Sequence, residues 1–167
     1  EVSGLMSLFK TFLDNELEKL LENDIRLMAI GDLERLPKSV RKSLDRNISQ
    51  TEANKSLHLI LALSYGGRED ILNETKKMAN EVRRGAISPD QIDKDMFSNH
   101  LWTANIPDPD VLIRTSGEIR ISNFLLWQLA YTEIIITNKL WPDFTEEDFL
   151  ECINEYSRRE RRYGRTS

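Results

Sequence analysis

Short, largely apolar segments alternate with amphipathic segments along this chain, and this alternation restricts its fold more than any other feature. The apolar runs at residues 25–30, 57–63, 111–113 and 134–137 each have the length of a strand. Helical patterns lie between them. Strands that alternate with helices and read as continuous apolar runs are typical of an α/β fold, in which helices cover both faces of a parallel β-sheet.

The helices are predicted where apolar residues recur three and four positions apart. The first such face, near the N-terminus, consists of Leu5, Leu8, Phe9, Phe12, Leu13, Leu17, Leu20 and Leu21. Further helices are expected after Pro37, from about Arg68 to Arg83, from Ser88-Pro89, from Ser122 and from Thr145.

The composition excludes several classes of protein. A chain of 167 residues is expected to form a single domain spanning residues 1–167. Its 23 basic and 28 acidic residues give a net charge of −5, which argues against a nucleic-acid partner bound through a broadly basic surface. The single cysteine, Cys152, supports no disulfide framework and fits a cytoplasmic location. No apolar stretch approaches the roughly 20 residues that a transmembrane segment needs.

The loop after the third apolar run carries the groups of an anion site. Arg114 follows the run directly, and Arg120 and Ser122 come after a turn that Gly117 permits. Guanidinium groups suit phosphate oxygens, and a helix start offers free N–H groups. Ligands of open α/β sheets also bind beyond the carboxyl ends of strands. We therefore predict a diphosphate site; the alternative for each arginine is an ion pair with Asp108, Asp110 or Glu118.

Other residues near this loop and at the C-terminus have competing interpretations. Ser122 is expected to cap the helix that it begins, a role that it can share with ligand contact. Glu133 lies where the next apolar run begins, and its spacing alone favours a surface charge over a metal ligand. A favourable interaction with the dipole of a last helical turn would explain the C-terminal arginines, which are Arg158, Arg159, Arg161, Arg162 and Arg165.

The sequence from Arg114 to Glu133 also resembles the signature of the cis-prenyltransferases, the undecaprenyl diphosphate synthase family. Similar elements are Ile30-Gly31-Asp32, Tyr65-Gly66-Gly67-Arg68 and Arg161-Arg162-Tyr163-Gly164, so the resemblance extends over the whole chain. It implies a parallel sheet ringed by helices around a hydrophobic tunnel. It also implies an enzyme, usually a homodimer, that adds isopentenyl diphosphate to an allylic diphosphate such as farnesyl diphosphate.

The resemblance implies further properties of the protein. Bacterial members make the undecaprenyl carrier lipid for cell-wall precursors, and contact with the membrane would come only through the product. Family residues that match Arg114, Arg120 and Ser122 hold the incoming isopentenyl diphosphate. The tail that contains Arg162 and Gly164 reaches the diphosphate site across a dimer interface. Glu133 matches a glutamate that helps to organise Mg²⁺, the implied cofactor.

The chain departs from the family pattern in one respect. The family's Asp-Gly-Asn-Gly-Arg-Trp loop, with its essential aspartate, does not occur in residues 1–167. It would lie upstream of Glu1, and we therefore expect this chain to lack the first strands of the family domain. We predict that no catalytic residue lies in this fragment and that the fragment alone is inactive. The alternative function is a noncatalytic prenyltransferase-like partner or scaffold subunit.

Two leucines on the expected sheet have two possible roles. Successive residues of a strand point to opposite faces of its sheet. Leu27 and Leu57 could therefore line an apolar channel, as the resemblance suggests, or could fill an ordinary core. The core is the favoured interpretation.

Overall fold

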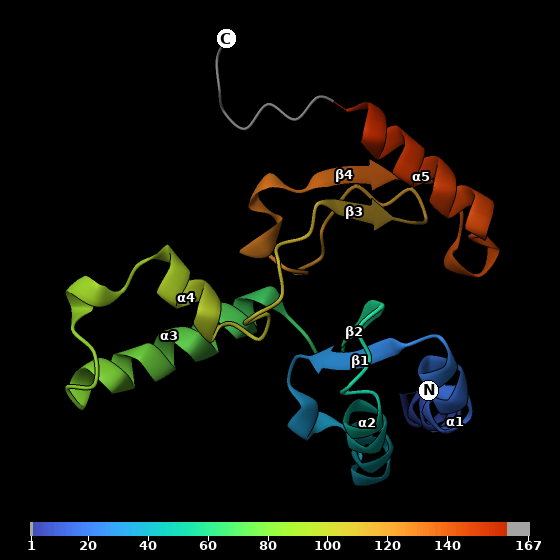
Figure 1. The fold of residues 1–167 in the computed structure, drawn as a ribbon. Coiled ribbons are helices and arrows are strands. Elements are labelled where there is room, and N and C mark those ends of the chain that lie inside the picture. The colour runs from blue at the N-terminus through green and yellow to red at the C-terminus, as the bar shows by residue number, and fades with distance from the viewer. Residues whose placement is uncertain (1, 160–167) are drawn as a thin grey trace.

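The computed structural model describes residues 2–159, with side chains from residue 4 onward, and its fold is α/β with parallel strands, as predicted (Figure 1). The helices are α1 (Val2–Glu22), α2 (Lys38–Gln50), α3 (Gly67–Arg83), α4 (Lys94–His100) and α5 (Glu146–Arg158). The strands are β1 (Ile25–Ile30), β2 (Leu57–Ala62), β3 (Val111–Arg114) and β4 (Glu133–Ile136). None of the described helices combines the length and the apolar character that crossing a bilayer requires.

The described strands form two separate parallel pairs instead of one continuous sheet. Strand β1 pairs with β2, with Ile25 opposite Leu57, and β3 pairs with β4, with Val111 opposite Glu133. In the part of the chain that the structure describes, no strand of one pair is therefore hydrogen-bonded to a strand of the other pair. A cavity of about 690 Å³ is lined by residues of β1 and β2, by residues 103–110 and by Phe124.

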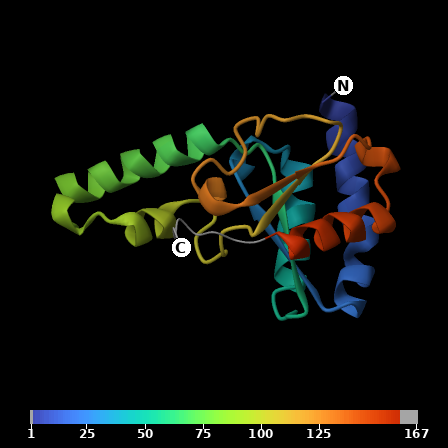
Figure 2. The same cartoon turned by 90° about the horizontal axis from the view of Figure 1, so that it is seen from above.

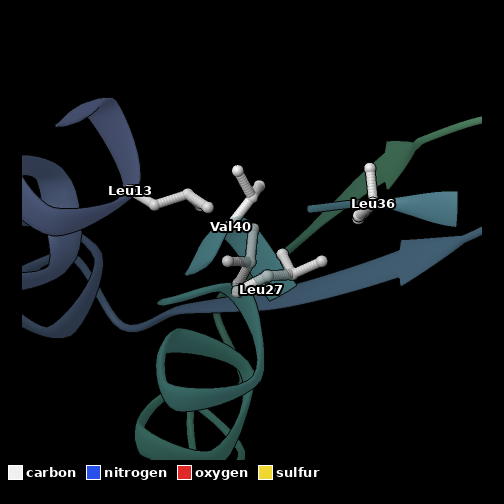
Figure 3. Packing of buried hydrophobic residues seen from close by; sticks show 5 residues of the cluster. Leu13, Leu27, Leu36 and Val40 are labelled. Carbon is white, nitrogen blue, oxygen red and sulfur yellow. The ribbon is translucent and has the colours of Figure 1, made fainter. Parts of the chain in front are cut away.

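The main hydrophobic core lies where α1 and α2 pack on β1. Leu13 of α1, Leu27 of β1, and Val40 and Leu44 of α2 are almost completely buried there (Figure 3). Leu57 of β2, by contrast, keeps 56% of its surface exposed. The core interpretation is thus confirmed for Leu27, whereas Leu57 fills no core among the described residues.

Most of the predicted helices form, and local sequence explains their ends. Pro37 directly precedes α2, and Gly85, with φ of +70°, follows α3. The Thr145 hydroxyl accepts a hydrogen bond from the Asp148 backbone N–H (3.3 Å), while the Asp148 carboxylate accepts one from the Thr145 N–H (2.9 Å). The helix expected at Ser88-Pro89 is only a single 3₁₀ turn, Pro89–Gln91, which precedes α4.

The prediction of a helix beginning at Ser122 is wrong. The segment forms turns, and only the 3₁₀ helix Gln128–Tyr131 follows it. Ser122, Asn123 and Leu125 have φ of +49°, +63° and +45°, which is left-handed backbone and cannot continue a right-handed helix. Ser122 therefore caps no helix. The apolar residues after Ser122 recur at helical spacing, but the backbone there makes a hydrogen bond to a distant segment instead: the Asn123 carbonyl accepts from the Gly67 N–H.

Helices α3 and α4 extend to one side of the strands, as the two perpendicular views show (Figure 1, Figure 2). The chain enters this projection after β2, through the Tyr65-Gly66-Gly67-Arg68 turn. It leaves the projection after α4, through Trp102, and continues to β3. Because α3 starts beside the turns at residues 122–125, the glycine turn and the arginine-containing loop lie side by side.

Candidate functional site

The site begins at the carboxyl ends of β3 and β4, where two backbone segments are bonded to each other. Arg114 is the last residue of β3, and its carbonyl accepts a hydrogen bond from the Thr137 N–H (2.9 Å). Beyond it, Ser116 N–H donates to the Lys139 carbonyl (2.7 Å) and Gly117 N–H donates to the Thr137 carbonyl (2.9 Å). These bonds hold the first part of the loop after Arg114 in place.

The far end of the same loop is bonded to the start of α3. The Gly67 N–H donates to the Asn123 carbonyl at 2.7 Å, and the Arg68 N–H donates to the Asn123 side-chain oxygen at 2.9 Å. Residues 115–123, here named the anchored loop, are therefore held at both ends. Their middle is open to solvent, and Ile119 keeps 84% of its surface exposed.

Arg114 differs from an ordinary surface arginine. Its Nε is buried and has no hydrogen-bond partner among the described residues, and its guanidinium forms no ion pair with a described carboxylate. A buried donor without a partner costs about 1–3 kcal/mol. The buried Nε–H of Arg114 is thus a donor for which the residues described by the structure supply no acceptor.

Arg120 and Ser122 lie in the open part of the anchored loop. The Arg120 Nη2 is 2.9 Å from Glu118 Oε2, and its side chain is 71% exposed. The pairing alternative is thus realised for Arg120, but an exposed ion pair contributes only about 0–1 kcal/mol and is readily exchanged for a stronger anion. Ser122 is exposed, and its hydroxyl has no partner in the described part of the chain. No described hydrogen bond joins these two side chains to Arg114, which directly precedes the anchored loop.

Glu133 lies at the opposite end of the strand pair from Arg114. It is the first residue of β4 and faces Val111, whereas Arg114 faces Ile136. The Glu133 carboxylate is 2.8 Å from the Arg159 guanidinium. Arg159 also donates to the Ile134 carbonyl (3.0 Å), and its hydrogen bonds to Glu133 and Glu155 raise its pKa.

Arg159 is thus a residue whose role the sequence interpretation missed. It follows α5 directly, but it acts through specific carboxylates and not only through the helix dipole. The position of Glu155 one helical turn earlier was the available signal. The predicted ligand residues Arg162 and Gly164 lie outside the described residues.

The described residues do not by themselves fit a Mg²⁺ ion. Within residues 2–159, no three or more His, Cys, Asp or Glu side chains are grouped so that they could hold a metal. Glu133 contributes one carboxylate, and Arg159 already neutralises it. Mg²⁺ requires about six oxygen ligands in near-octahedral geometry, commonly with water among them. Glu133 could be one ligand only if further groups came from elsewhere.

The glycine turn after β2 allows the anchored loop to approach α3 closely. A Cβ added at Gly67 would lie 2.8 Å from Leu126 Cγ and 3.0 Å from the Leu126 backbone nitrogen. One added at Gly66 would lie 2.1 Å from Glu69 Oε2. Both distances are too short for a side chain. Close packing against Leu126, in the segment that follows the anchored loop, therefore requires glycine at position 67, whereas a side chain at position 66 would displace the end of the Glu69 side chain.

A buried carboxyl group, that of Asp70, lies in the first turns of α3. Asp70 is 1% exposed and accepts hydrogen bonds from the Trp102 backbone N–H (3.0 Å) and the Tyr65 hydroxyl (3.3 Å). Burial raises its pKa, and the neighbouring Glu74 carboxylate adds to the rise, while the two hydrogen bonds and Lys77 oppose it. Burial raises the pKa of Tyr65 as well. Asp70 thus connects Tyr65, the first residue of the glycine turn, to Trp102, which lies just after α4.

The raised pKa of Asp70 predicts a definite dependence of stability on pH. Its folded-state pKa lies above the unfolded one, so its stabilising contribution is complete below the unfolded pKa and is lost as pH rises through the folded pKa. We expect the difference in free energy of unfolding, wild type minus Asp70→Asn, to fall as pH rises above the pKa of an aspartate in the unfolded chain, which is about 3.9. Urea unfolding at several pH values measures this difference.

Asp24 provides a matched control for that experiment. Its pKa is lowered, first by the Ser56 hydroxyl and then by the Lys55 backbone N–H. The stabilising contribution of Asp24 is therefore present above the unfolded pKa and is lost as pH falls through the folded one. The difference between wild type and Asp24→Asn should rise with pH, opposite to that for Asp70→Asn. Slopes of the same sign would contradict the assignment of Asp70.

Comparison with known proteins adds an independent line of evidence. The family described as "Putative undecaprenyl diphosphate synthase" matches residues 1–164. Isoprenyl transferases from Chlorobaculum tepidum and Porphyromonas gingivalis are each 52% identical over 167 residues, which is 100% of this chain. The match covers 63% and 66% of those two proteins, so this chain spans less than two thirds of their length.

Two solved structures are also similar to this chain. Lavandulyl diphosphate synthase from Lavandula x intermedia, in complex with dimethylallyl diphosphate, is 44% identical with a TM-score of 0.95, and the match covers 99% of this chain and 72% of the other. A "probable undecaprenyl diphosphate synthase" from Campylobacter jejuni is 33% identical with a TM-score of 0.85, over 99% and 75% of the two chains.

Proposed function

Because this chain belongs to the undecaprenyl diphosphate synthase family, we propose that Arg114 and the anchored loop after it hold the diphosphate group of isopentenyl diphosphate. The single observation that carries the proposal is the buried Nε–H of Arg114, which has no described partner at the carboxyl end of β3. Phosphate oxygens are strong acceptors for a guanidinium, and a charged hydrogen bond contributes more than a neutral one. A diphosphate is thus a fitting partner for this group.

Two residues of the anchored loop, Arg120 and Ser122, extend the same proposed site. Arg120 would exchange its exposed contact with Glu118 for a second phosphate contact, and the Ser122 hydroxyl would donate to a further oxygen. The family resemblance adds Arg162 and Gly164 from a second copy of the chain, and we propose a homodimer on that basis. Two arginines and a hydroxyl offer several donors, which suits a ligand with many phosphate oxygens.

The longer protein of which this chain can be part is proposed to be a prenyltransferase. It would condense isopentenyl diphosphate with an allylic diphosphate, of which farnesyl diphosphate is the first candidate, and the product would be the cis-polyprenyl carrier lipid of bacterial cell-wall synthesis. The isoprenyl transferases that match all of residues 1–167 support this reaction class. We propose a cytoplasmic location, with the membrane contacted only through the product.

Mg²⁺ is proposed as a cofactor of the longer protein only, with Glu133 as one of its ligands. In that role a divalent cation would offset charge on diphosphate oxygens. Glu133 pairs with Arg159, and no group of three or more His, Cys, Asp or Glu side chains that could hold a metal is found within residues 2–159, so further ligands would come from the rest of the longer protein.

Titration of residues 1–167 with isopentenyl diphosphate tests the proposed site. We expect calorimetric binding of isopentenyl diphosphate and no measurable binding of isopentenol, because the charged donors recognise the diphosphate and not the hydrocarbon. Equal affinity for both compounds, or binding of neither, would overturn the proposal.

A second assay on the same sample tests the predicted inactivity. With radiolabelled isopentenyl diphosphate, farnesyl diphosphate and Mg²⁺, residues 1–167 are expected to form no elongated product. Product formation would show that the fragment carries a complete active site. If the protein extended to the length of its relatives also binds diphosphate without elongating it, the alternative function of a noncatalytic partner subunit is supported.

A further inference from the structure

Asn123 joins two sequence motifs that lie far apart in the chain. Its backbone carbonyl accepts from the Gly67 N–H (2.7 Å), its side-chain oxygen accepts from the Arg68 N–H (2.9 Å), and its side-chain nitrogen donates to Glu69 Oε2 (2.9 Å). All three bonds reach consecutive residues in the first turn of α3. One residue therefore fastens the end of the anchored loop to the glycine turn.

The backbone around Asn123 needs such a contact. Ser122, Asn123 and Leu125 all adopt left-handed backbone, which costs a residue other than glycine about 1–2 kcal/mol. Asparagine tolerates this conformation better than most residues, and a strained segment persists only when its surroundings hold it. The three hydrogen bonds of Asn123 supply that restraint on the α3 side.

The glycine turn is shaped to receive Asn123. A Cβ at Gly66 would lie 2.9 Å from the Asn123 side-chain nitrogen and 2.1 Å from Glu69 Oε2, so any side chain there would displace the hydrogen-bonded pair. The hydrogen bond from Asn123 is also the first cause of the lowered pKa of Glu69. The Tyr65-Gly66-Gly67-Arg68 turn and the end of the anchored loop thus form one structural unit.

We infer that Asn123 is a positioning residue that sets the affinity of the site for isopentenyl diphosphate by holding the end of the anchored loop against the first turn of α3. This inference rests on the proposed function of the loop. Ser122 directly precedes Asn123, Arg120 lies two residues further back, and both are exposed. Without the three bonds, these two side chains lose a defined position, and the ligand must then order them at a cost in binding free energy.

An exchange of chemical groups between Asn123 and Glu69 tests the inference. Asn123→Asp removes the donor and places two carboxylates in contact, so the Kd for isopentenyl diphosphate should rise about tenfold or more. The double variant Asn123→Asp/Glu69→Gln restores a hydrogen bond in the reverse direction and has the net charge of the wild type. We expect it to recover an affinity within about threefold of the wild type.

Two binding results would overturn the inference: an unchanged Kd in Asn123→Asp, or a double variant that binds no better than Asn123→Asp although both have the thermal stability of the wild type. Amide hydrogen exchange at Arg68, measured without ligand, reports the contact independently of binding. Exchange should accelerate in Asn123→Asp and slow again in the double variant; if it does not, the inference fails.

The proposed function can fail separately from the inference. If the wild-type chain binds no diphosphate but the variants show the expected exchange pattern, the proposed function is refuted and the contact of Asn123 with α3 is not.

Discussion

Arg114→Ala is expected to weaken the binding of isopentenyl diphosphate to residues 1–167 by about 10- to 100-fold. A hydrogen bond between charged groups is worth about 1.5–3 kcal/mol, and each 1.4 kcal/mol corresponds to about a tenfold change in Kd. The Arg114 Nε–H is buried and has no described protein partner, so the ligand is its proposed acceptor. Calorimetric titration of both proteins measures the loss.

The effect on binding should be separate from any effect on stability. Because no described group loses a hydrogen bond in Arg114→Ala, its free energy of unfolding should remain within about 1 kcal/mol of the wild type. Arg114→Lys retains the charge but not the planar fork, and an intermediate loss of affinity is expected.

Arg41→Ala is a suitable control for Arg114→Ala, because it removes the same charge from α2, where Arg41 pairs with Glu34 and Asp45. It should leave the Kd unchanged. An equal loss of affinity in Arg41→Ala and Arg114→Ala would mean that net charge, and not a contact made by Arg114, governs binding.

Gly31→Ala is expected to destabilise the protein by more than about 3 kcal/mol, the largest effect on stability that a single methyl group should have here. Gly31 has φ of +111°, and a Cβ there would lie 2.1 Å from the Leu63 carbonyl oxygen and 3.2 Å from Tyr65 Cα. These are backbone atoms of the segment after β2, so they cannot rotate away as a side chain could. The ends of β1 and β2 would have to separate.

Two other glycines separate the causes of this effect. Gly85 has φ of +70° but open space around it, so Gly85→Ala should cost only about 1–2 kcal/mol of conformational strain. Gly4 lies within α1 with nothing nearby, and Gly4→Ala should stabilise by about 0.5–1 kcal/mol. Urea unfolding of the three variants checks this order. A loss in Gly31→Ala no greater than that in Gly85→Ala would contradict the predicted clash.

The sequence was most informative where short-range patterns act alone. The apolar runs at β1 and β2, the helix α1, the turn at Gly85 and the cap at Thr145 were all predicted from residues a few positions apart, and the structure confirms them. On the predicted apolar face of α1, Leu13 is buried, but Leu5, Leu8, Phe12 and Leu21 are exposed. The position of Arg114 at the carboxyl end of a strand was predicted in the same way. The proposal that residues 1–167 form one domain depends on such patterns too and stays a proposal.

Prediction failed where a local pattern competes with distant contacts. The residues after Ser122 are apolar at helical spacing, yet Asn123 bonds to the first turn of α3, and three residues adopt left-handed backbone. Arg159 was assigned to a helix dipole, but it pairs with Glu133 across 26 positions of the chain. Neither partner is visible in a window of neighbouring residues.

By itself, the sequence determined the order of the strands, most of the helices and the loop that carries the arginines, because periodicity and turn residues act over one or two helical turns. Only the tertiary structure decided that Glu133 lies at the other end of its strand pair from Arg114, and that Asn123 fastens the anchored loop to α3. Those facts depend on strand register and on hydrogen bonds between segments far apart in the chain. Packing of the whole molecule brings such segments together, and no local propensity specifies it.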